Sequence, residues 1–206
     1  MSRHRTLLPL PAELRSARVI VRPYRTEDGE AVYAAIDESR ELLRPWMPWV
    51  HSHQSAADSR DFCVRAAASW LLRTTLDLGM FAADDGRYLG GTGFPRLDWE
   101  ARSFEIGYWV RRSAEGHGYV REAVQALTRL AFEELAANRV EICCDARNER
   151  SRNVAERLGF VHEGRLRNHG LDPEGQPRDT LVFALIPDDY ARVRGEWWPG
   201  GRGWAE

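Results

Sequence analysis

The chain has 206 residues, of which 43% are hydrophobic and 10% aromatic, so we expect one globular domain with a sizeable core. This composition excludes a disordered or low-complexity protein. No apolar run approaches the ~18 residues of a membrane-spanning helix, and the N-terminus lacks the apolar stretch of a secretory signal. The 29 basic and 31 acidic residues leave a net charge of −2, which disfavours nucleic acid as a partner.

The N-terminal half contains signals for two helices and three short strands. In chain order we predict a strand at 17–22, a helix at 26–39, a loop or broken helix at 42–53, a helix at 55–76 and a hairpin with strands at 80–83 and 88–94. Pro23 ends the first strand, and Thr26 is a typical N-cap for the first helix. Ser55 and Asp58 resemble a capping box at the start of the second helix.

The C-terminal half alternates strands and helices. We predict a strand at 103–110, a loop at 111–118, a helix from residue 119, a strand at 139–145, a helix at 151–158 and strands at 159–168 and 179–185. The order β-α-α-β-β-β-α-β-α-β-β predicts a single α/β domain, with a mixed central sheet of about seven strands and helices on both faces. We expect residues 1–16 to be an N-terminal extension, 17–186 the domain and 187–206 a partly mobile tail.

Cysteine, histidine and lysine usage bears on the compartment and on metal binding. Cys63, Cys143 and Cys144 are odd in number and lack CxxC spacing, which favours a reducing cytoplasm over a disulfide framework. His51 and His53 have no further ligand pattern, so no metal site is expected. The chain contains no lysine; coding bias is the simpler explanation, and avoidance of self-modification is the alternative.

Residues 105–124 (EIGYWVRRSAEGHGYVREAV) predict a strand, a loop with Gly116 and Gly118, and a helix beginning where the loop ends. The free N–H groups of such a helix N-terminus favour an anion, above all phosphate. A Walker loop requires a lysine that this chain lacks, and the third glycine of a dinucleotide fingerprint is missing. The alternative is an ordinary strand–turn–helix connection.

Several motifs, in order and spacing, resemble the GNAT superfamily of acyl-CoA-dependent N-acyltransferases, and within it the ribosomal-protein N-terminal acetyltransferases of the RimJ/RimL type. The motifs are EIGYWV at 105–110, GHGY at 116–119, Asn148-x-x-Ser151 and ERLGF at 156–160, with LRPWMPW at 43–49 and EGRLR at 163–167. The resemblance covers roughly residues 19–185. It implies a GNAT-like fold, acetyl-CoA as co-substrate and no metal.

The resemblance also implies a coenzyme A site. Its expected residues are Val110, Glu115, Gly116, His117, Gly118, Tyr119, Val120, Asn148 and Ser151. Glu115 departs from the Gln or Arg of the family motif, and Val120 departs from its small final residue. The side chain of Glu115 therefore has to turn away from a pyrophosphate, with Arg111, Arg112 and Arg121 available to compensate its charge.

The expected catalytic residues are Glu105 and Ser151. Glu105 matches a family position for a general base, while an exposed strand glutamate is the alternative. In the family a tyrosine often acts as the general acid that protonates the departing coenzyme A thiolate, but Ala155 occupies that position here. The resemblance therefore implies Ser151 as the proton donor. The alternative role for Ser151 is that of a helix cap. Trp46 and Trp49 either line the acceptor side or anchor a broken helix.

These features predict direct acetyl transfer from acetyl-CoA to a primary amine, with the α-amine of a protein N-terminus preferred, in the cytoplasm. A covalent route through Cys143 or Cys144 is disfavoured, because mid-strand cysteines are typically buried and inert. The alternatives are a small-molecule amine (an amino acid, polyamine or antibiotic) as acceptor, or a non-catalytic acyl-CoA sensor. No membrane partner is expected, and a homodimer is left open.

Overall fold

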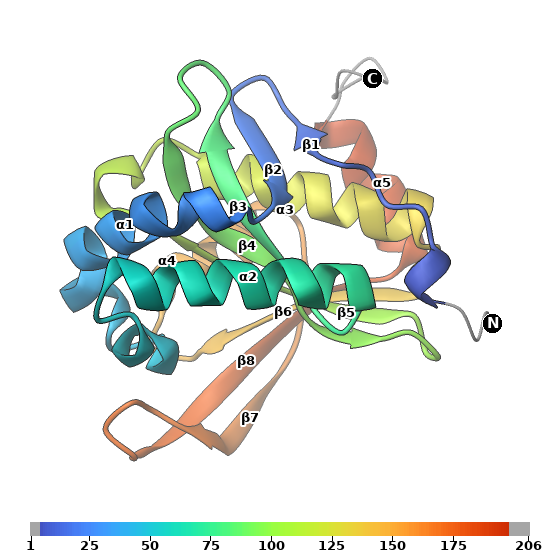
Figure 1. Cartoon of the computed structure of the whole chain (residues 1–206). Coiled ribbons are helices and arrows are strands. Elements are labelled where there is room, and N and C mark those ends of the chain that lie inside the picture. The colour runs from blue at the N-terminus through green and yellow to red at the C-terminus, as the bar shows by residue number, and fades with distance from the viewer. Residues whose placement is uncertain (1–4, 198–206) are drawn as a thin grey trace.

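Eight strands form one sheet in the computed structural model, which describes residues 5–197 (Figure 1). Their spatial order is β1-β2-β3-β4-β5-β6-β8-β7. The strands are β1 (Leu14–Arg15), β2 (Val19–Pro23), β3 (Leu76–Ala82), β4 (Tyr88–Asp98), β5 (Ser103–Val110), β6 (Arg139–Asp145), β7 (Val161–Leu171) and β8 (Pro177–Leu185). Only β5 and β6 pair in parallel; the other neighbours are antiparallel. The two-residue β1 accounts for the difference from the seven predicted strands.

Helices cover both faces of the sheet, which confirms the predicted α/β class. They are α1 (Gly29–Leu43), α2 (Ala56–Leu72), α3 (Tyr119–Arg129), α4 (Glu149–Arg157) and α5 (Pro187–Trp197). Figure 1 shows α1 and α2 in front of the sheet. Their buried residues, among them Ile36 and Cys63, pack with Phe81 and Tyr88 of the sheet. On the other face α3, α4 and α5 contribute to one larger core, in which Phe104 is fully buried.

The sheet opens between β5 and β6, and this opening positions the site. The two strands pair only where Ser103–Glu105 meets Arg139–Glu141, although both continue beyond that point. Past the last pair their facing backbone groups have no partner strand, and a ligand entering the wedge can satisfy them. Helices α3 and α4 begin shortly after β5 and β6 end, so the N-termini of both lie at the open end of the wedge.

Three local expectations are wrong, each for a local physical reason. Residues 187–197 form helix α5, because burying Tyr190 and Val193 against the core outweighs the polar, tail-like composition; residues 198–206 of the expected tail lie outside the described part. Helix α2 ends at Leu72 because Arg73 adopts a left-handed conformation, with φ of 56°, so β3 begins earlier than predicted. Asn148, and not Ser151, caps α4.

Candidate active site

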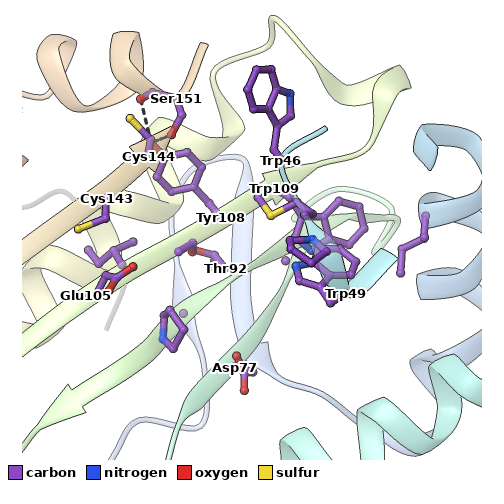
Figure 2. A pocket seen from close by; sticks show the side chains of 18 of the residues that line it. Trp46, Trp49, Asp77, Thr92, Glu105, Tyr108, Trp109, Cys143, Cys144 and Ser151 are labelled. Carbon is purple, nitrogen blue, oxygen red and sulfur yellow. Dashed lines mark hydrogen bonds between the residues drawn. The ribbon is translucent and has the colours of Figure 1, made fainter. Parts of the chain in front are cut away.

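A cavity of about 450 Å³ lies on the α1/α2 side of the sheet and extends into the wedge between β5 and β6. Its size is in the range of small-molecule sites. Among the lining residues, Figure 2 labels Trp46, Trp49, Asp77, Thr92, Glu105, Tyr108, Trp109, Cys143, Cys144 and Ser151. Asn148 also lines it, whereas residues 115–120 do not. The expected catalytic and acceptor residues therefore share one cavity, and the loop that we expect to bind phosphate, residues 115–120, lies outside it.

Glu105 projects from β5 into this cavity and is largely buried, with 14% of its side chain exposed. Arg96 Nη1 lies 3.3 Å from its Oε2, and among the described residues no group makes a hydrogen bond to that oxygen. Burial raises the pKa of Glu105, while the charge of Arg96 lowers it less. A largely buried carboxylate that lines a cavity, and whose pKa is raised by burial, has the properties of a general base.

Ser151 forms a hydrogen-bonded pair with Tyr108 on the opposite wall of the wedge (Figure 2). The Tyr108 hydroxyl lies 3.0 Å from Ser151 Oγ and 3.0 Å from the Ser151 carbonyl oxygen. Asn148 Oδ1 accepts a hydrogen bond from the Ser151 N–H at 3.0 Å, which fixes the first turn of α4. With Asn148 as the cap, the Ser151 hydroxyl is free to face the cavity. Burial raises the pKa of Tyr108, so this phenol stays a hydrogen-bond donor.

Tyr108 is a residue that the sequence analysis missed. Strand periodicity places Tyr108 on the face of β5 opposite to Glu105. The sequence analysis looked for a tyrosine as general acid only at the position of Ala155. Glu105 and Tyr108 nevertheless line the same cavity, because the wedge between β5 and β6 runs through the sheet and not along one face. No signal in the sequence reports how far two parallel strands diverge.

The loop before α3, called the cradle below, has a backbone geometry that suits an anion. Gly116 and Gly118 have φ of 77° and 83°, a conformation that favours glycine. The first hydrogen bond within α3 runs from the Glu122 N–H to the Gly118 carbonyl, so the N–H groups of residues 119–121 remain free within the helix. A Cβ built on Gly116 would meet no atom within 4 Å, which leaves this backbone open to a ligand. These features fit a pyrophosphate.

The charged residues around the cradle are paired in a way that the sequence did not predict. Glu115 forms an ion pair with Arg150 at the start of α4, so its carboxylate is neutralised and links the loop to that helix. Arg111 is engaged by Glu38 of α1 and is not free to compensate Glu115. Glu38 also accepts a hydrogen bond from the Ser113 N–H at 2.6 Å, and these contacts hold its pKa down at about 2.

The remaining cradle residues follow the expected positions. Val110 ends β5, and Tyr119 and Val120 form the first turn of α3. His117 is outside the cavity, where Nδ1 lies 2.8 Å from the Glu115 carbonyl oxygen and the imidazole stacks on Tyr119. The imidazole therefore stabilises the loop and approaches neither Glu105 nor Ser151 within hydrogen-bonding distance.

The segment between α1 and α2, which carries Trp46 and Trp49, forms the wall of the cavity opposite the wedge. Trp49 packs against Trp109 of β5, with ring centroids 5.6 Å apart, and against the buried His53 at 5.6 Å. Trp46 lines the cavity from the segment after α1 (Figure 2). Trp49 therefore both anchors this segment and faces the cavity, so the two predicted roles, anchoring a broken helix and lining the acceptor side, are compatible.

In both cysteines of β6, burial outweighs the neighbouring groups that would lower the thiol pKa. Burial raises the pKa of the Cys143 thiol to about 12, and it raises the pKa of Cys144 as well. Cys143, Glu105 and Glu141 place three potential ligand atoms within 4.8 Å of one another. Arginines already neutralise the two carboxylates of this group, since Arg139 pairs with Glu141 and Arg96 lies beside Glu105.

The thiols of Cys143 and Cys144 are poor nucleophiles at neutral pH, because their pKa values are raised.

Comparisons with known proteins agree with this geometry. The acetyltransferase (GNAT) domain family matches residues 18–161. "Putative ribosomal N-acetyltransferase YdaF" of Bacillus subtilis is 33% identical over 175 residues, which cover 84% of this chain and 93% of that protein. The ribosomal-protein-serine acetyltransferase of Escherichia coli is 29% identical, over 76% of this chain and 86% of that protein.

The structure of RimL, a ribosomal L7/L12 α-N-protein acetyltransferase in complex with coenzyme A, superposes with a TM-score of 0.79. It is 20% identical and the match covers 86% of this chain and 99% of that one. At this identity the likeness shows a shared fold.

None of the helices between residues 5 and 197 combines the length and the apolar character of a membrane-spanning segment.

Proposed function

This chain belongs to the GNAT acetyltransferase family, and from that premise we propose that its acceptor is the α-amino group of a protein N-terminus. It is an acetyl-CoA-dependent N-acetyltransferase. The observation that carries the proposal is Glu105, a largely buried carboxylate that lines the cavity beside the wedge. We assign the enzyme to the cytoplasm, in keeping with its free cysteines.

The cradle before α3 supports a site for the pyrophosphate of acetyl-CoA. The free N–H groups of residues 119–121 and the positive end of the α3 dipole act on the phosphate charge. The wedge between β5 and β6 then receives the pantetheine arm, whose amide groups match the unpaired strand edges. This places the thioester near both Glu105 and Ser151, with Asn148 beside the arm.

In the proposed reaction Glu105 takes the proton that the amine has to lose before it attacks the thioester carbonyl, directly or through one water. The raised pKa of Glu105 brings its proton affinity closer to that of an amine. Trp46 and Trp49 exclude water from the acceptor side, which strengthens the interaction of the carboxylate with the ammonium group.

Ser151 donates its hydroxyl proton to the departing thiolate, and while it does so its oxygen accepts a hydrogen bond from Tyr108, which lies 3.0 Å away. Water then returns a proton to the serine oxygen, and Glu105 releases to water the proton that it took from the amine. Before the reaction Tyr108 can instead donate to the Ser151 carbonyl oxygen, also at 3.0 Å. The phenol has one proton and two acceptors, so it keeps the Ser151 oxygen positioned in both arrangements. Tyr108 is thus a positioning residue for Ser151.

The preference for an N-terminal amine follows from proton affinities. An α-amino group titrates near ~8 and a lysine near ~10.4, so deprotonating lysine at neutral pH costs about 3 kcal/mol more. A site with one carboxylate base is better matched to the easier amine. The names of the relatives, which are ribosomal-protein acetyltransferases, support the same acceptor class.

The test uses one peptide sequence in two forms, with either the N-terminus or an internal lysine chemically blocked. Release of free coenzyme A thiol and the mass of the peptide are measured together. We expect the peptide with the free N-terminus to be acetylated at least ~10-fold faster, in line with the difference in amine pKa. Preference for the lysine peptide, or turnover only with a free polyamine or amino acid, contradicts the proposal. Binding of acetyl-CoA without any turnover indicates a sensor.

A further inference from the structure

Asp77 is a carboxylate of the cavity that the proposed chemistry does not use. It lies on β3, on the side of the sheet that carries Glu105 and Trp49 (Figure 2). Its Oδ2 accepts a hydrogen bond from the Thr75 hydroxyl at 2.6 Å. Among residues 5–197 the Asp77 carboxylate has no ion pair, and no group donates a hydrogen bond to its Oδ1. Burial raises the pKa of Asp77, and Thr75 offsets this only in part.

The basic residues nearest to the cavity have other partners. Arg65 of α2 pairs with Asp61 at 3.0 Å, and Arg178 of β8 donates to the carbonyl oxygen of Leu171 at 3.2 Å. A half-buried carboxylate without a counter-charge costs stability, so its presence in a cavity points to a ligand that supplies the charge.

A strip of glycine connects Asp77 to the catalytic end of the cavity. Asp77 pairs with Gly93 of β4, and Gly93 pairs with Gly107 of β5, two residues from Glu105. Gly93 carries no side chain here, and at Gly107 the floor is formed by the ring of Pro95, which packs over this glycine and also lines the cavity. With neighbouring strands ~4.8 Å apart and residues along a strand ~3.3 Å apart, the Cα atoms of Asp77 and Glu105 are about 12 Å apart.

The surroundings of Asp77 suit a cation. Trp49 and Trp109 present aromatic rings to the same cavity, and their faces attract an ammonium or guanidinium group. An extended chain advances ~3.4 Å per residue, so a long side chain on the second or third residue of a peptide spans the distance from Glu105 to Asp77.

We propose that Asp77 binds a positively charged side chain of the acceptor, so that the enzyme selects protein N-termini with Arg or Lys at the second or third position. This inference rests on the proposed function. The carboxylate accepts charge-assisted hydrogen bonds from the cation, and the aromatic wall excludes water from the pair.

The experiment compares peptides that start with Ser and carry Arg, Gln or Glu at the second and third positions, with every lysine acetylated. The wild-type enzyme is expected to use the Arg peptide with a kcat/KM about 10–100-fold above the Gln peptide, the usual range for a charged hydrogen bond. In Asp77→Asn that advantage is expected to disappear through an increase in KM, while turnover of the Gln peptide changes less than twofold. Asp84→Asn, on an exposed turn, is the matched control.

Thermal unfolding distinguishes recognition from a structural role. Asn can still accept the Thr75 hydrogen bond and carries no charge, so Asp77→Asn is expected to melt no lower than the wild type. Equal use of the Arg and Gln peptides by the wild type, or an equal loss with both in a less stable Asp77→Asn, overturns the inference. If no peptide is acetylated but spermidine is, in an Asp77-dependent manner, the proposed function fails and the cation site stands.

Discussion

Glu38 provides a quantitative test of how the loop before the cradle is held. Its carboxylate accepts a hydrogen bond from Arg111 Nε at 2.9 Å and one from the Ser113 N–H at 2.6 Å, so α1 is tied to the segment that leads into α3. These contacts lower the pKa of Glu38 from 4.5 to about 2. A shift of this size corresponds to at most about 3.4 kcal/mol at neutral pH, at ~1.36 kcal/mol per unit.

The side chain of Glu38 is 27% exposed, so solvent screening reduces this limit and we expect Glu38→Gln to cost about 1–2 kcal/mol at pH 7. Because the folded-state pKa is depressed, the stabilisation is present above the ordinary value of 4.5 and is lost as the pH falls towards 2. By pH 3 roughly half of the difference between variant and wild type should disappear.

Urea unfolding at pH 7 and pH 3 measures the difference, with Glu41→Gln on the same helix as the control. A second readout is the KM for acetyl-CoA, which should rise in Glu38→Gln because the loop before the cradle is less restrained. A loss of stability that is independent of pH, or equal in the two variants, refutes the assignment of the Glu38–Arg111 contact as the anchor of this loop.

Three further predictions concern the proposed chemistry. Glu105→Gln should lower kcat by ~10²–10⁴-fold and abolish the acidic limb of the pH–rate profile. In the wild type this limb should lie above the ordinary glutamate pKa, because burial raises the pKa of Glu105. An unchanged profile excludes Glu105 as the base. Tyr108→Phe and Ser151→Ala should each lower kcat, and the double variant should lose no more than Ser151→Ala alone, whereas additive losses contradict a coupled pair. By calorimetric titration, Gly118→Val should weaken coenzyme A binding at least ~10-fold, because φ there is 83°, while Glu115→Gln should be neutral or favourable; the reverse ranking contradicts the cradle.

The features that depend on neighbouring residues could be predicted from the amino-acid sequence. The order of elements, the helical spacing after Tyr119 and the two glycines of the loop are local patterns, because periodicity and backbone conformation are set within a few residues. For the same reason the sequence placed Glu105 on one face of β5 with Gly107 and Trp109. It also indicated that the side chain of Glu115 has to turn away from a phosphate, although its partner Arg150 was not foreseen.

Which of these residues contact one another depends on how the whole chain folds. The wedge exists because pairing between β5 and β6 stops after Glu105, and this brings Tyr108 to Ser151, 43 positions along the chain. The register of β3 against β4 and β5 aligns Asp77 with Gly93 and Gly107 on the floor of the cavity that also contains Glu105. Such contacts depend on strand register and divergence across the whole sheet, which no local pattern of residues encodes.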